Sequence, residues 1–102
     1  MNKIMLEGII VSELEIKNIG FSICNFILAV DRIGAKAGKQ NIDFFRIEAL
    51  GKNADLIKQH FKKGDKIHVE GVMLLDEVKK NVAGKLEYRI YPKVKLESIK
   101  FN

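Results

Sequence analysis

One helix-like segment in a chain that otherwise has the pattern of strands is the feature that most constrains the fold. Residues 54–63 place Ala54, Ile57 and Phe61 at the spacing of one helical face, and a glycine follows directly. Asn53 is the type of residue that caps a helix at this point. The sequence therefore predicts a single helix, starting after Asn53 and ending near residue 63, in a mostly β chain.

Strand-like segments lie on both sides of this helix. Their apolar residues alternate or run continuously, and many of them are β-branched. The strands are expected at residues 3–11, 21–30 and 42–50 before the helix, and at 66–74 and 86–101 after it.

The last of these segments contains an irregularity. Its apolar residues change phase after Leu96, which predicts a β-bulge near Glu97 or Ser98. Pro92 cannot donate a backbone hydrogen bond, so it indicates an edge or irregular position.

The connections between the segments are polar and rich in glycine. Residues 13–20 are expected to form a short connection. The stretch between the second and third strands has no periodicity and holds Arg32, Lys36 and Lys39. Residues 76–85 are also basic and contain a glycine, which is typical of a hairpin loop. Two basic loops are therefore expected.

The order of elements predicts an all-β fold with one helix. Three strands, a helix and two strands is the order of the OB-fold, a five-stranded Greek-key barrel with its helix between strands 3 and 4. The whole chain, residues 1–102, is expected to form this one domain. In such barrels the second and third strands and nearby loops bind nucleic acids or sugars.

The charge of the chain is unevenly distributed. Eighteen Lys and Arg against thirteen Asp and Glu give a net charge of +5. Residues 1–34 contain three bases and four acids, so the positive surplus falls in the remainder. A localised surplus points to a polyanion such as nucleic acid or to an anionic membrane surface, with solubility alone as the alternative.

Other function classes find little support in the sequence. Cys24 is the single cysteine, and His60 and His68 are the two histidines, so no zinc or catalytic-thiol set is visible. There is also no phosphate loop and no signal peptide or apolar membrane span. We therefore expect no enzyme, no metal, no cofactor and no membrane partner, and a cytoplasmic location.

Alternation along residues 42–50 gives two neighbouring aromatic rings different environments. It sends Phe45 and Ile47 to one face and Phe44 and Arg46 to the other. A ring beside a guanidinium suits a stacked base and its phosphate, although Phe44 could instead be an ordinary, partly buried residue. Phe45 is expected in the core or at a subunit contact.

Four blocks of sequence resemble a known family. They are MNKIMLEG at residues 1–8, NFILAV at 25–30, FFRIEALGK at 44–52 and KKGDKIHVEG at 62–71. In sequence and order they resemble the DNA-binding domain of bacterial and phage single-stranded DNA-binding proteins. The resemblance covers essentially the whole chain.

This resemblance implies an OB-fold that coats and protects single-stranded DNA, without strong sequence preference, during replication, recombination or repair. It also implies a homo-oligomer, with a tetramer favoured over a dimer, in a bacterial cell or a phage-infected host. In the family, the position of Phe44 carries a base-stacking aromatic, usually Trp. An OB-fold protein-interaction module of the primosome accessory type, binding nucleic acid only weakly, is the alternative.

The chain departs from the family in two respects. It contains no Trp, and the family's other Trp positions fall near Ile33 or Gly34, at Leu50 and at Val78. Binding is therefore expected to be weaker and more sensitive to salt than in Trp-rich relatives. The family's acidic C-terminal tail is also missing, so the chain looks like a short form, and recruitment of other proteins through such a tail is not expected.

The candidate nucleic-acid contacts combine the two basic loops with the polar face of residues 42–50. For each lysine, a solvated surface is the alternative, and Tyr88, paired with Arg89 as a second stacking site, could belong to the core. Met5 joins Phe45 at the core or a subunit interface. The predicted contacts are Arg32, Lys36, Lys39, Phe44, Arg46, Leu50, Lys52, Val78, Lys79, Lys80, Lys85, Tyr88 and Arg89.

Overall fold

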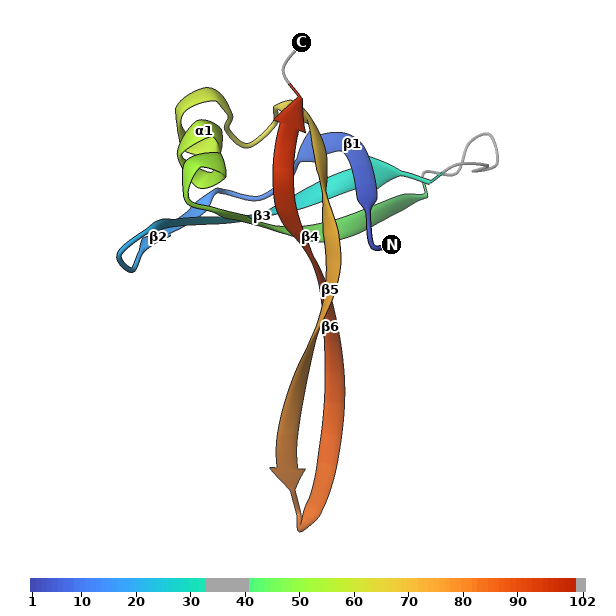
Figure 1. Cartoon of the computed structure of the whole chain (residues 1–102). Coiled ribbons are helices and arrows are strands. Elements are labelled where there is room, and N and C mark those ends of the chain that lie inside the picture. Colours follow the sequence, from blue (N-terminus) through green and yellow to red (C-terminus); the bar gives the residue numbers. More distant parts are fainter. Residues whose placement is uncertain (33–40, 101–102) are drawn as a thin grey trace.

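The structure is a computed structural model that describes residues 1–32 and 41–100. Within these ranges the chain forms six strands and one helix (Figure 1). The elements in order are β1 Ile4–Ile10, β2 Glu15–Asn18, β3 Ser22–Asp31, β4 Ile42–Leu50, α1 Lys52–His60, β5 Lys66–Val82 and β6 Lys85–Lys100.

The strands form one sheet that closes on itself. Its order is β1-β5-β6-β4-β3-β2, and β1 also pairs with β3. This closing contact is short, with Ile9 opposite Ala29 and Ile10 opposite Leu28. The β4–β6 pair is parallel and the other pairs are antiparallel. The predicted mostly β barrel with one helix is confirmed.

The core lies inside this barrel, where alternate residues of five strands meet two residues of the helix. Period-two alternation explains which side chains point inward. The buried apolar residues are Ile10 of β1, Cys24, Phe26 and Leu28 of β3, Ile47 and Ala49 of β4, Ala54 and Ile57 of α1, Ile67 and Val69 of β5, and Val94 and Leu96 of β6.

The helix differs from its predicted bounds at both ends. Gly51, with φ 59°, precedes the first turn, and Asn53 lies inside the helix, where its amide donates to the Glu97 carbonyl at 3.1 Å. The helix ends at His60 because the next residues form a turn. In that turn the Asp65 carboxylate accepts a hydrogen bond from the Lys62 backbone N–H at 2.9 Å. The cap prediction was therefore wrong, although the existence and core-facing side of the helix were right.

The segment 76–85 is the largest correction to the predicted elements. It is not a loop, because β5 continues unbroken to Val82 and β6 begins at Lys85. Only Ala83 and Gly84 form the turn, with φ angles of 52° and 78°. Two positive φ angles are the mark of the tight hairpin turn whose twist matches its strands.

The resulting hairpin extends well beyond the barrel (Figure 1). We call residues 75–92 the arm. The radius of gyration is 15.6 Å, whereas a compact domain of this length has about 13 Å. The arm accounts for an elongated rather than spherical molecule.

Two smaller features of the sheet also bear on the predictions. Residues 15–18, expected in a connection, form the short strand β2 along β3, which makes the helix follow the fourth strand rather than the third. The bulge in β6 is confirmed, since Leu96 lies opposite Gly71 and Ser98 opposite Glu70, which leaves Glu97 as the extra residue.

Candidate nucleic-acid interface

The outward face of β4 presents the predicted aromatic ring to solvent. Phe44 is 66% exposed, and Arg46 on the same face is also exposed. Phe45 points the other way, is half-buried and packs against the core. The alternation of β4 therefore separates the two rings as predicted, and Phe45 belongs to the core.

A groove of about 260 Å³ opens between this part of β4 and the base of the arm. We call it the β4 groove. It brings three aromatic rings and two cationic side chains together with three other apolar residues. Its lining consists of Phe44, Phe45 and Arg46 of β4, Met73 of β5, and Tyr91, Pro92, Lys93 and Val94 of β6.

Tyr91 and Lys93 are contributors that the sequence reasoning missed. Both precede the buried Val94 on β6, at odd-numbered positions whose side chains point away from the core. The alternation of β6 could therefore have predicted that they lie on the outer face. Their proximity to Phe44 could not be predicted from alternation, because it depends on the parallel pairing of Ile47 with Val94.

Lys93 connects the outer face of β4 with the arm. Its Nζ lies 3.0 Å from Asp76 Oδ2 and 3.3 Å from Glu48 Oε2. The hydrogen bond to Asp76, followed by that to Glu48, raises the pKa of Lys93, so it remains charged at neutral pH. The outer faces of the barrel and the arm are therefore continuous at this residue.

Arg32 lies at the end of β3, beside Asp43 of β4. Its Nε donates to Asp43 Oδ2 at 3.2 Å, and a second nitrogen contacts the other carboxylate oxygen. This hydrogen-bonded guanidinium holds the pKa of Asp43 below its usual value. The carboxylate offsets the charge of Arg32, so Arg32 offers a polyanion less free charge than its sequence position suggested.

The basic residues of the arm divide between two opposite faces. In an antiparallel pair, residues directly opposite each other share a face. Val78 pairs with Arg89, and Lys80 and Lys85 share their face, which continues outward from Lys93. We call this the outer face of the arm, with Asp76, Val78, Lys80 and Val82 of β5 and Lys85, Glu87, Arg89 and Tyr91 of β6.

Tyr88 lies on the other side, which we call the inner face of the arm. It pairs with Lys79, whose Nζ is 5.5 Å from the centre of the ring. Tyr88 is 57% exposed, so it is not a core residue. The expected stacking pair of Tyr88 with Arg89 was wrong, because neighbouring residues of a strand point to opposite faces.

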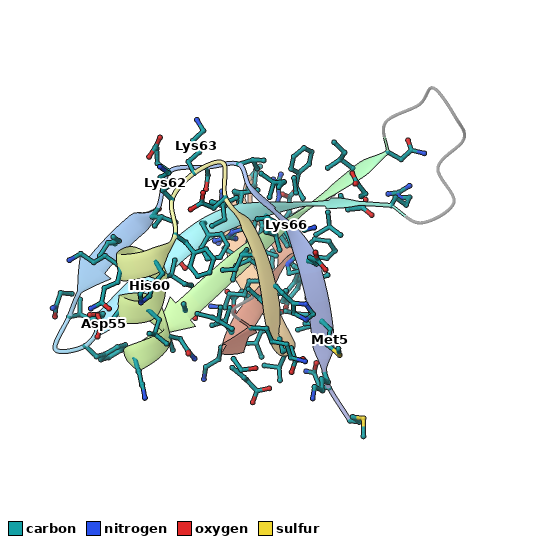
Figure 2. All side chains as sticks on the ribbon, turned by 90° about the horizontal axis from the view of Figure 1, so that it is seen from above. Met5, Asp55, His60, Lys62, Lys63 and Lys66 are labelled. Atoms are coloured by element: carbon teal, nitrogen blue, oxygen red, sulfur yellow. The ribbon has the colours of Figure 1, made fainter. Side chains whose placement is uncertain are left out.

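The remaining candidates are spread around the barrel. Leu50 is half-buried at the far end of β4, and Lys52 is exposed at the start of α1. Met5 is 56% exposed on β1, where Figure 2 shows it at the margin of the molecule, so it is not part of the core. Lys36 and Lys39 lie outside the described residues.

The described part of the chain also bears on metal binding and on membrane spanning. Within residues 1–32 and 41–100, no three His, Cys, Asp or Glu side chains are grouped so that they could hold a metal ion. In the same ranges, no helix has the length and apolar character to span a membrane.

Comparison with known proteins identifies the relationships of the chain. The model of the single-strand binding protein family matches residues 1–101. The chain belongs to this family. A solved structure described as the Plasmodium falciparum SSB complex with ssDNA is similar, with a TM-score of 0.79 and 26% identity, over 94% of this chain and 86% of that one. The OB-fold expectation is thereby confirmed.

Several bacterial members of the family are similar in sequence. Single-stranded DNA-binding protein 2 of Clostridium acetobutylicum is 40% identical over 74 residues, which cover 70% of this chain and 56% of the relative. The single-stranded DNA-binding protein of Thermotoga maritima is 31% identical over 105 residues, covering 98% of this chain and 72% of the relative. The chain spans about half the length of three of the clostridial relatives that it matches.

Proposed function

We propose that this member of the single-strand binding protein family coats single-stranded DNA without strong sequence preference. The observation that carries the proposal is the β4 groove, in which the exposed Phe44 and the half-buried Tyr91 lie beside Arg46 and Lys93. Such a role serves DNA replication, recombination and repair in the cytoplasm of a bacterial cell or infected host. It is a binding role and not a catalytic one.

The proposed strand follows the outer face of β4 and crosses the β4 groove to the outer face of the arm. Rings supply stacking that every base can use, typically about 1–3 kcal/mol per base in OB-folds that bind single strands. Arg46, Lys80, Lys85 and Arg89 supply charge for the phosphates. Neither contribution depends on the identity of the base, which accounts for the lack of sequence preference.

The balance between these two contributions follows from the composition. The chain contains no Trp, six Phe and two Tyr. Leu50 and Val78, at two of the family's Trp positions, can contact a base but cannot stack on it. Phosphate contacts therefore supply a larger share of the affinity, and binding is expected to weaken steeply with salt.

Self-association is part of the proposal, with a tetramer favoured and a dimer as the alternative. β1 pairs with β3 only through Ile9 and Ile10. Among the described residues, no strand pairs with the corresponding edge of β1 from Ile4 to Glu7. An unpaired edge next to the exposed Met5 is a natural place for a second copy to bind.

The test is a fluorescence anisotropy titration of labelled oligo(dT) at two salt concentrations. The proposal requires tight binding whose logarithm falls with log[salt] by about 0.7 for each phosphate contacted. Weak binding that is indifferent to salt would instead favour a protein-interaction module of the primosome accessory type. Competition with oligo(U) separates a preference for DNA from general single-strand binding.

A further inference from the structure

The inner face of the arm is an apolar surface that the proposed DNA path does not use, except at Pro92, which also lines the β4 groove. Four large apolar side chains lie on it, each between 55% and 64% exposed. They are Leu75 on β5 and Leu86, Tyr88 and Ile90 on β6, and the remaining inner-face residues are Glu77, Lys79, Asn81 and Pro92.

This face continues the inside of the barrel. On β5 the buried Ile67 and Val69 have the same phase as Leu75, and on β6 the buried Val94 has the same phase as Ile90. The apolar pattern of the core therefore extends along the arm after the barrel has ended. A two-stranded ribbon is only marginally stable alone in water, so an apolar face on it needs a covering surface.

The two faces of the arm differ in net charge, so they suit different partners. The inner face carries one acid, Glu77, and one base, Lys79, so its charges cancel. The outer face carries three bases against two acids and joins the β4 groove at Lys93. A polyanion is therefore drawn to the outer face, and the inner face is suited to a protein surface that is apolar and nearly neutral.

The inner face has these properties itself, which makes a second copy of the same face a complementary partner. When two arms lie face to face about a two-fold axis level with Val78 and Arg89, β5 lies on β5 and β6 on β6. Glu77 then lies opposite Lys79 of the other copy, and Ile90 lies opposite its Tyr88. The apolar residues of β6 and the opposite charges of β5 are thus matched in the same arrangement.

We propose that the inner face of the arm docks on the inner face of the arm of a second copy of this chain. The inference rests on the proposed homo-oligomer and names the surface that forms it. Together with pairing at the β1 edge, this contact supplies a second, different two-fold interface. Two such interfaces generate a closed tetramer when their two-fold axes cross at right angles, whereas either alone gives a dimer.

The first test changes one apolar residue and measures mass without DNA, by sedimentation velocity over a range of protein concentrations. Ile90→Asp places one carboxylate from each copy in the apolar contact, so it should raise the dissociation constant of the assembly by about a hundredfold. The measured mass should therefore correspond to a smaller assembly than in wild type. Val82→Asp, an exposed residue of the outer face, is the matched control and should keep the wild-type mass.

The second test uses the charge pair to report the orientation. Glu77→Lys places Lys opposite Lys79, and Lys79→Glu places Glu opposite Glu77, so each variant should assemble more weakly than wild type at low salt. An equal mixture of the two variants pairs every Lys with a Glu and should recover the wild-type mass.

A monomeric wild-type chain, an unchanged mass for Ile90→Asp, or no recovery in the mixture would each overturn the arm-to-arm contact. Because mass is measured without DNA, these outcomes are independent of the oligo(dT) titration. A chain that assembles as described and binds no oligo(dT) would refute the proposed function and leave this contact standing. Circular dichroism melting of each variant shows that the barrel is intact.

Discussion

At the scale of the residue, two neighbouring phenylalanines of β4 have different roles. Phe45 packs on the core and helps to hold β4 in the barrel, whereas Phe44 is exposed at the β4 groove. An exposed aromatic ring does not contribute the stabilising free energy that its burial would provide. The exposure of Phe44 is therefore consistent with the proposed contact, in which a DNA base covers the ring.

Removal of the exposed ring should affect binding and leave the fold intact. Phe44→Ala is expected to weaken oligo(dT) binding by about 1–3 kcal/mol, because one stacking platform is lost. Anisotropy titration measures the affinity, and a thermal melt checks the fold. Ile19→Ala, at another exposed apolar residue, is the control and should bind as wild type. Equal affinity of Phe44→Ala and wild type would refute the assigned face of β4.

Glu70 gives a prediction about pH. Its carboxylate lies 3.1 Å from Lys100 Nζ and 3.8 Å from Lys3 Nζ, with His68 at 3.9 Å. The hydrogen bond from Lys100 holds the pKa of Glu70 below its usual value. A lowered pKa in the folded state stabilises the fold above the unfolded value of about 4.3, and this contribution is lost as pH falls through the lowered pKa.

Glu70→Gln should therefore melt at a lower temperature than wild type at pH 7, and the difference should close as pH falls below about 4. Melting curves at a series of pH values measure this. Glu87→Gln, which removes a carboxylate from the exposed arm, is the matched control for the loss of one charge. A gap that persists unchanged in acid would mean that Glu70 stabilises the fold by packing and not by charge.

Residue environments were predictable where a strand has one buried face. The alternation of β4 separated Phe44 from Phe45 because successive side chains point to opposite sides and only one side meets the core. Tyr91 and Lys93 were missed because their position at the β4 groove depends on which strands pair. The free charge of Arg32 was overestimated because its partner Asp43 lies on the neighbouring strand β4, eleven residues away in the chain.

At the scale of the element, the arm is the feature that the sequence pattern concealed. Both of its faces are exposed in the single chain, and the β5 residues around Lys79 and Lys80 show no clear alternation of apolar and polar side chains. The same reason hides β2, whose four residues are all exposed. The helix could be predicted because the spacing of its apolar residues matches one buried helical face. Its ends could not be predicted, because they depend on the turns on either side.

The turn of the arm yields a prediction at this scale. Ala83 has a positive φ, a conformation that costs a residue with a Cβ about 1–2 kcal/mol. Ala83→Gly should relieve this cost and slow hydrogen exchange of the arm amides, with little change in the melting of the barrel. Gly84→Ala should do the opposite. Faster exchange in Ala83→Gly than in wild type would contradict this description of the turn.

At the scale of the whole molecule, close approach of two strands closes the barrel. A Cβ at Gly8 of β1 would collide with the backbone carbonyl oxygen of Ala29 in β3. Glycine thus lets the two strands meet at the Ile9 and Ile10 pairs. Apart from β2, the order of strands along the chain was predictable from the sequence, since each segment has its own pattern. This strand contact and the assembly were not, because they depend on distant parts of the chain.

Gly8→Ala should therefore destabilise the molecule by about 3 kcal/mol, as expected for overpacking against a backbone atom that cannot move freely. Urea unfolding measures the change. Gly20→Ala is the comparison, since a Cβ there meets nothing within 4 Å, and its positive φ alone should cost about 1 kcal/mol. If Gly8→Ala costs no more than Gly20→Ala, the tight closure between β1 and β3 is wrong.

The path of the strand is the central claim, and photo-crosslinking tests it most directly. An oligonucleotide carrying 5-iododeoxyuridine reacts on irradiation with an aromatic side chain that stacks on it, and mass spectrometry then identifies the residue. The account predicts adducts at Phe44 and Tyr91, which line the β4 groove. Adducts at Tyr88 on the inner face of the arm or at Phe21 beside β3, with none at Phe44, would contradict it.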